Sequence, residues 1–238
     1  MTDLSHRNGP TPILSADVPV TLAGGGDLLS SDLRDCLALA PRLVAADGGA
    51  DRLLVLGALP EAVIGDMDSI SKAGRAALPR DVLYPVAEQD STDFEKCLTR
   101  VHAPIILALG VLGPRSDHAL AAYNTLVRHP DRRCILVDDS DIVLLAPPSL
   151  SLDLAPETRV SLFPMAPLGG RSTGLFWPID GLEFAPNLQT GTSNRATGPV
   201  RLEFDAAAML LILPRAMLPA LIAAVLAAPG WPAIQSDR

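Results

Sequence analysis

The stretch best suited to chemistry is Ile64-Gly65-Asp66-Met67-Asp68-Ser69, where two carboxylates lie two residues apart after an apolar run and a glycine. In an extended segment Asp66 and Asp68 point to the same side, and a turn at the glycine brings both toward one point. Mg²⁺ is usually held by one or two carboxylates, while water and substrate phosphate oxygens complete its shell. The spacing favours a magnesium site. A loop in which Asp68 or Ser69 merely caps a helix near Ser71 is the alternative.

A second acidic group follows the apolar segment 43–46, which is predicted to be a buried strand that ends at Asp47-Gly48-Gly49. Ligands of parallel sheets gather beyond the carboxyl ends of the strands, and Asp47 falls at such a position. An ordinary Asp-Gly turn explains the same residues equally simply. A third strand is expected over 62–64, and it delivers the Asp66 loop to the same edge in the same way.

A third group lies in Gln89-Asp90-Ser91-Thr92-Asp93-Phe94-Glu95-Lys96. Thr92 and Glu95 have the spacing of a capping box, so a helix is predicted to begin here. Apolar residues at i, i+3, i+4 and i+7 from Phe94 define its buried face, and Asp93 and Lys96 lie off that face. Asp93 and Asp90 add two carboxylates to the supply near Asp66, although an acid in the first turn is also ordinary helix electrostatics.

Two more polar groups stand out along the chain. Arg115 follows a glycine turn and precedes a predicted helix, a setting suited to phosphate because a fixed fork of donors joins the helix dipole. Asp117 and His118 beside it are either functional or a structural helix cap. Farther on, Gly191-Thr192-Ser193-Asn194 is rich in short donors and acceptors, and a turn is its default explanation.

The elements that must position these groups fall into two kinds. Strand and helix signals alternate over residues 18–138, which predicts an α/β fold with a mostly parallel sheet flanked by helices. Residues 139–214 carry proline- and glycine-separated apolar segments, which predict a smaller C-terminal all-β sandwich. Its expected strands span 142–145, 159–163, 175–177, 182–184, 200–204 and 209–213.

The two ends of the chain are predicted to lie outside these units. Residues 1–17 are expected to form a flexible tail without a secretory signal. The apolar stretch 206–228 is interrupted by Pro214, Arg215 and Pro219, so we interpret it as a strand followed by a helix from about Arg215, within a C-terminal segment over 215–238. A membrane anchor is the disfavoured alternative.

Composition excludes several classes of protein. With 238 residues, of which 48% are apolar, the chain can bury a sizeable core and is not disordered. Its net charge of −8 is the wrong sign for a protein that grips nucleic acid through phosphates. Cys36, Cys97 and Cys134 lack metal-ligand spacing and sit in apolar segments, so buried free thiols in a reducing cytoplasm are expected.

Taken together, these polar groups occur in the order and rough spacing of the thiamine pyrophosphokinase family, which the chain resembles over about residues 18–213. The resemblance implies that ATP gives its pyrophosphoryl group to the hydroxyl of thiamine, leaving thiamine diphosphate and AMP. It also implies a homodimer that needs Mg²⁺ and forms its sites between subunits. The charge, the prolines and the cysteines separately predict no nucleic-acid or membrane partner and a cytoplasmic location.

The resemblance also implies roles for individual residues. It assigns Asp66, Asp68 and Asp93 to the metal and the triphosphate, and it places Asp90, Arg115 and Asp117 around the reacting groups. It puts a further set in contact with ATP or thiamine: Asp47, Gly48, Ser91, Thr92, Lys96, His118, Thr192, Ser193 and Asn194. Trp177 is the aromatic residue expected near the thiamine ring.

Three departures from the family pattern bear on this assignment. Gln89 stands where a lysine is common, Pro114 replaces a small residue in the glycine turn, and Met67 replaces the usual aromatic. The first two weaken the phosphate side of the site, so a nucleotide- or thiamine-binding sensor without catalysis is an alternative function. A magnesium-dependent phosphotransferase acting on another alcohol is a second alternative, because spacing alone does not choose between attack at the β- and γ-phosphate.

Overall fold

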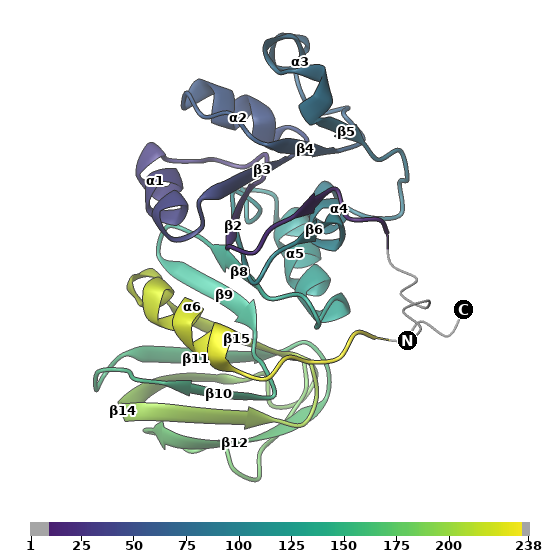
Figure 1. The fold of residues 1–238 in the computed structure, drawn as a ribbon. Helices are drawn as coiled ribbons and strands as arrows, with labels where there is room; N and C mark the ends of the chain where they lie inside the picture. The colour runs from purple at the N-terminus through teal and green to yellow at the C-terminus, as the bar shows by residue number, and fades with distance from the viewer. Residues whose placement is uncertain (1–9, 235–238) are drawn as a thin grey trace, which may run out of the picture.

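The structure is a computed structural model, and it describes residues 10–234 of the chain. Apolar segments form a long sheet with helices on both faces of its first half (Figure 1). The helices are α1 (Ser30–Leu39), α2 (Gly49–Val55), α3 (Lys72–Ala77), α4 (Asp93–Arg100), α5 (Ser116–Arg128) and α6 (Leu218–Ala227), with 3-10 turns η1 (Arg80–Val82) and η2 (Arg215–Met217). This arrangement confirms the mixed α/β class.

The first half of the sheet is parallel. Its spatial order is β5-β4-β3-β2-β7-β8, and every neighbouring pair in that series runs in the same direction. The strands are β2 (Val20–Ala23), β3 (Arg42–Ala46), β4 (Ala62–Gly65), β5 (Leu83–Pro85), β7 (Ile106–Leu109) and β8 (Cys134–Val137). Parallel strands bring their carboxyl ends to one edge, so the loops after β3 and β4 emerge side by side.

Alternation along these strands divides the core between the two faces of the sheet. Ala45 and Val63 pack in one cluster with α1 and α2, whereas Val44 and Ile64 pack in the other with α4 and α5. Successive side chains of a strand point to opposite faces, which is why continuous apolar runs are needed where helices cover both sides. Asp93 and Lys96 enter the site from α4, on the second face.

The second half of the sheet is antiparallel, beginning where β9 pairs with β8. Its strands are β9 (Asp141–Leu145), β10 (Ser149–Leu152), β11 (Arg159–Pro164), β12 (Leu168–Leu175), β13 (Glu183–Phe184), β14 (Thr192–Phe204) and β15 (Met209–Pro214). The long strand β14 pairs with β11 through its first residues and with β10 and β12 through its later ones. It therefore connects β10, β11 and β12, which lie in the lower part of Figure 1.

Several local predictions are wrong. The strand expected over 175–177 lies earlier, because β12 ends at Leu175 and residues 176–177 are bends. The turn expected over 191–194 becomes the start of β14. The segment expected to be a tail contains β1 (Leu14–Ser15), which pairs in parallel with β6 (Val101–His102). The rest of the expected tail, residues 1–9, lies outside the described residues.

The C-terminal apolar stretch forms β15, η2 and α6, as the interrupting prolines indicated. Leu218, Leu221, Ile222 and Val225 of α6 are buried in the chain's own core. Other residues of this helix, among them Ala220, Ala223 and Leu226, are apolar and exposed, so the chain covers α6 on one face only. Over residues 10–234, no helix is both long enough and apolar enough to cross a membrane.

Candidate active site

The centre of the site is the pair of loops that follow β3 and β4. Asp47 comes directly after β3 and is almost fully buried, with only 1% of its surface exposed. Its carboxylate accepts hydrogen bonds from the backbone N–H groups of Ser69 at 3.1 Å and Ile70 at 2.9 Å. Burial raises the pKa of Asp47, and the two N–H bonds oppose that rise. Asp47 therefore fixes the shape of the neighbouring acidic loop.

The acidic loop itself bends sharply through Met67, which adopts a φ of 67° in the left-handed region. Oδ1 of Asp66 accepts the N–H of Asp68 at 3.2 Å, a local bond that holds the bend. Asp47 also has a positive φ, of 37°. Non-glycine residues persist in this region only where surrounding contacts impose it, which is common at functional sites. The turn that was expected at Gly65 is thus made at Met67, between the two carboxylates.

Three carboxylates meet at this point. One oxygen each from Asp47, Asp66 and Asp68 lie within 4.8 Å of one another. Gly65 makes the approach possible, because a Cβ atom there would lie 2.7 Å from Cβ of Asp47 and 3.0 Å from Oδ1 of Asp93. A hard divalent cation prefers carboxylate oxygens, so this donor set fits Mg²⁺. Asp93, which was expected in the set, borders it and shares the partner Lys96 with Asp66.

Asp93 is held by Lys96, whose side chain is buried. Nζ of Lys96 lies 3.0 Å from Oδ1 of Asp93 and 3.0 Å from Oδ2 of Asp66. Burial acts to lower the pKa of Lys96, but the hydrogen bonds to the two carboxylates outweigh it and the net direction is upward. The same bond from Lys96 lowers the pKa of Asp66 to about 2. The ammonium therefore ties α4 to the loop after β4.

The segment before α4 adds polar contacts that sequence reasoning missed. Nε2 of Gln89 donates to Oδ2 of Asp66 at 3.1 Å, so this residue contacts the acidic centre although it carries no charge. The carboxylate of Glu88 accepts the N–H groups of Asp90 and Ser91 and the Ser91 hydroxyl. The side chain of Asp90 is exposed. Ser91 is thus engaged with Glu88 in this structure.

The predicted capping box is half present. Oγ1 of Thr92 accepts the N–H of Glu95 at 3.2 Å, as a helix cap should. The Glu95 side chain does not return the bond. It lies buried and reaches α5, where it meets Nη1 of Arg128 and Nε2 of His129, each at 2.8 Å. The spacing of the two residues indicated the helix start correctly, but it gave no signal of the clamp to α5.

Arg115 and Asp117 lie at the start of α5, and both are exposed. Nε and Nη2 of Arg115 donate to the two oxygens of Asp117 at 3.1 and 2.6 Å. The hydrogen bond from Arg115 lowers the pKa of Asp117. His118 is exposed beside them. In this structure the expected phosphate-binding arginine is paired with the carboxylate next to it.

The last expected group, Thr192, Ser193 and Asn194, lies in β14, in the lower part of Figure 1 and away from β3 and β4. Asn194 is buried, and its amide donates to the carbonyl of Trp177 at 2.7 Å and accepts the Trp177 N–H at 3.2 Å. It therefore fixes the backbone at Trp177. Ser193 is exposed, and the hydroxyl of Thr192 is buried without a hydrogen-bond partner among residues 10–234.

Asn194 supports an exposed aromatic surface. The rings of Phe176 and Trp177 meet edge to face with centroids 4.7 Å apart, and they are 46% and 54% exposed. The guanidinium of Arg195 lies 4.0 Å from the Phe176 ring centroid. Aromatic side chains left open to solvent in this way offer a face to a ring or a cation. The acidic centre and this aromatic surface are separate features of one chain.

Comparison with known proteins identifies the family. Residues 33–137 match the family described as "Thiamin pyrophosphokinase, catalytic domain". Thiamine pyrophosphokinase 1 of rice is 30% identical over 185 residues, which are 63% of this chain and 70% of the relative. Thiamin pyrophosphokinase 1 of Caenorhabditis elegans is 27% identical over 217 residues, which are 82% of this chain and 88% of the relative.

Solved structures agree in fold. The thiamin pyrophosphokinase from Geobacillus thermodenitrificans aligns with a TM-score of 0.69 and 23% identity, covering 82% of this chain and 97% of that one. The enzyme from Candida albicans aligns with a TM-score of 0.70 and 17% identity, covering 86% and 93%. These likenesses show the fold, and the rice relative, 30% identical and covered over 70% of its length, shows that the chain belongs to the thiamine pyrophosphokinase family.

Proposed function

We propose that this protein transfers the pyrophosphoryl group of ATP to the hydroxyl of thiamine, releasing AMP. The observation that carries the proposal is the gathering of Asp47, Asp66 and Asp68 at the carboxyl edge of the sheet, in a chain of this family. Transfer of a phosphoryl group needs an in-line hydroxyl and compensation of phosphate charge, without a covalent protein nucleophile. Burial raises the pKa of the Cys36 thiol to about 11, so it is protonated and unreactive at neutral pH.

We assign Mg²⁺ to the carboxylates of Asp66 and Asp68, with Asp47 as the third acidic group. Bound there, the ion would neutralise charge on the phosphate oxygens and orient them. Asp47 has both oxygens engaged by backbone N–H groups, so it holds the loop and offers its remaining lone pairs. The prediction that Asp93 is also a ligand stays a prediction; in the structure its Oδ1 pairs with Nζ of Lys96, which it would hold next to the metal site.

We assign Lys96 and Arg115 to the triphosphate. Lys96 lies between Asp66 and Asp93, close enough to the acidic centre to exchange a carboxylate for a phosphate oxygen. Arg115 is exposed at the start of α5 and would have to leave Asp117 to reach a phosphate. That exchange would free Asp117 for the reacting hydroxyl or the thiazolium ring. Gly48, Ser91, Thr92, His118 and Asp90 are assigned to the surrounding contacts.

Thiamine is assigned to a site shared between two subunits. Within one chain the aromatic surface at Phe176 and Trp177 directly follows β12, which Figure 1 shows in the lower part of the molecule, away from β3 and β4. A homodimer that sets residues 139–214 of one subunit against residues 18–138 of the other would unite the two. The first unit would act as the thiamine-binding β-sandwich and the second as the ATP-binding α/β domain. Sedimentation should then give the mass of two chains.

The free, buried cysteines support a reducing compartment, and we place the protein in the cytoplasm. The decisive experiment is incubation of the purified protein with thiamine, ATP and Mg²⁺, followed by separation of AMP from ADP. AMP formed in step with thiamine diphosphate is the expected result. ADP would indicate ordinary γ-phosphoryl transfer, and tight binding without any product would indicate a sensor.

A further inference from the structure

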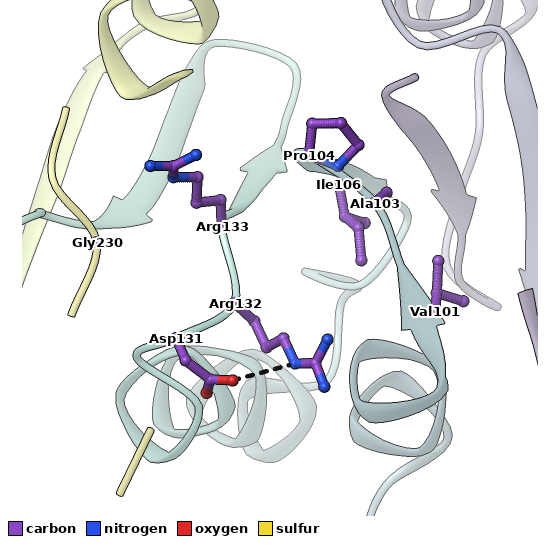
Figure 2. Close-up of a pocket in the computed structure, with 8 residues that line it drawn as sticks. All are labelled: Val101, Ala103, Pro104, Ile106, Asp131, Arg132, Arg133 and Gly230. Carbon is purple, nitrogen blue, oxygen red and sulfur yellow. Dashed lines mark ion pairs between the residues drawn. The ribbon is translucent and has the colours of Figure 1, made fainter. Parts of the chain in front are cut away.

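A pocket with two arginines lies at the opposite edge of the parallel sheet from the acidic centre. Its volume is about 260 Å³. It is bounded by β6, the start of β7, the segment that leads from α5 into β8, and the segment after α6; Figure 2 shows the residues that line it. Its lining residues are Val101, Ala103, Pro104, Ile106, Asp131, Arg132, Arg133 and Gly230. Because Ile106 begins β7 and Leu109 ends it, the length of this strand separates the pocket from the carboxyl edge.

The two arginines are only partly satisfied by the protein. Arg132 uses Nε for Asp131, at 3.4 Å, and Nη2 for the ring of His102, at 3.0 Å. Arg133 uses Nη2 for the carbonyl of Ala228, at 2.8 Å. Within residues 10–234 these bonds leave Nη1 of Arg132, and both Nε and Nη1 of Arg133, without a protein acceptor. Guanidinium donors in a fixed planar fork are suited to carboxylates, which they can bind in pairs.

The pocket has two separate polar groups and an apolar side. In Figure 2 the side chains of Arg132 and Arg133 point away from each other, while Ala103, Pro104 and Ile106 form a wall beside them. One small ion such as phosphate would meet only one of the diverging guanidinium groups. A molecule with an acidic group at each end and carbon between them would meet both and cover the apolar wall.

We propose that this pocket binds a small organic dianion, a short-chain α,ω-dicarboxylate in its chemistry. The volume is slightly below the range of about 300–1,000 Å³ typical of pockets for drug-sized ligands, which suits a shorter molecule. Two arginines against one aspartate make the pocket locally cationic in a chain of net charge −8. Since guanidinium groups stay charged at all accessible pH values, binding does not require a titrating protein group.

The test is isothermal titration calorimetry of the full chain in magnesium-free buffer, with malonate, succinate, glutarate and adipate in turn and acetate as the monovalent comparison. The expected result is one saturable site per chain whose affinity passes through an optimum with chain length. Leaving magnesium out keeps the acidic centre repulsive to anions, so a bound dicarboxylate reports on the pocket alone. Arg132→Met and Arg133→Met should each weaken binding by about tenfold or more, because each removes charge-assisted hydrogen bonds.

Two further variants keep the test sharp. Ala103→Glu retains both arginines but adds a carboxylate to the wall, so it should abolish binding without removing either guanidinium group. Arg171→Met removes an exposed arginine of β12, far along the chain from the pocket, and should leave affinity unchanged. The proposal is overturned if dicarboxylates bind no more tightly than acetate, or if folded Arg132→Met, Arg133→Met and Ala103→Glu bind them as the unaltered protein does.

Discussion

Replacing Lys96 by methionine tests the central ion-pair network directly. The substitution keeps most of the buried apolar stem and removes the ammonium that lies 3.0 Å from both Asp66 and Asp93. The fall in the pKa of Asp66 from 3.8 to about 2 corresponds to about 2.5 kcal/mol in the folded state; the bond from Lys96 is its largest cause, and bonds from Asp68 and Gln89 add to it. The two carboxylates keep 13% and 28% of their side-chain surface exposed, so rehydration reduces the expected loss to about 1–2 kcal/mol.

The pH dependence distinguishes this ion pair from simple loss of packing. The folded pKa of Asp66 lies below its ordinary value, so the stability that it contributes is present above about pH 4 and falls as the pH drops toward 2. About half should be gone by pH 3. The raised pKa of Lys96 sets the alkaline limit, because its contribution is lost only as the pH rises above 10.5. The difference in free energy of unfolding between the unaltered protein and Lys96→Met should therefore be constant from pH 5 to 9.

The assay is urea denaturation of both proteins in metal-free buffer at pH 7, 5 and 3. Lys72→Met serves as the control, because Lys72 is exposed and should change the free energy of unfolding by no more than about 0.5 kcal/mol. The claim that Lys96 stabilises the fold through Asp66 is refuted if the two proteins have the same free energy of unfolding at pH 7. It is also refuted if their difference at pH 3 is as large as at pH 7. Bound Mg²⁺ should narrow this difference at pH 7, since a cation can replace the ammonium as partner.

Three further outcomes follow from the site. Asp68→Asn should lower turnover by about a hundredfold or more while unfolding as the wild type does, because it removes a proposed metal ligand and no backbone support. Gly65→Ala should lower the free energy of unfolding by about 1–3 kcal/mol and also lower activity, because the added Cβ would lie 2.7 Å from Cβ of Asp47. The control Gly230→Ala has open space around the added Cβ and should change neither quantity. Asn194→Ala should raise KM for thiamine and leave KM for ATP unchanged, because it frees the backbone at Trp177.

The parallel half of the fold was predictable because its signals are local. Continuous apolar runs such as residues 43–46 must lie between two layers of helices, and this run ends in a glycine-rich loop. Strand β12 was missed for the opposite reason. Its sequence, Leu168-Gly-Gly-Arg-Ser-Thr-Gly-Leu175, has little apolar alternation, and Gly174 has a φ of 79° where the register shifts. Its pairing comes from β14, and sequence spacing carries no trace of that contact.

The acidic centre was predictable in its main residues for a similar reason. Carboxyl ends of neighbouring parallel strands share an edge, so Asp47 and Asp66 had to be close once β3 and β4 were paired. The place of Lys96 could not be obtained in this way. Helical spacing put it off the apolar face, which ordinarily means solvent, whereas it is 1% exposed between two carboxylates. A buried lysine is intelligible only when its partners are known.

The network around Lys96 also bears on how the site is assembled. Asp66 comes from the loop after β4, and Asp93 and Lys96 come from the first turn of α4, which Glu95 in turn clamps to α5. Three elements are thereby fixed relative to one another before any ligand arrives. Preformed positions of this kind spare the enzyme the cost of ordering its charges during the reaction. A phosphate that takes Lys96 from Asp66 would leave that carboxylate free for the metal, so nucleotide and metal should bind with positive cooperativity.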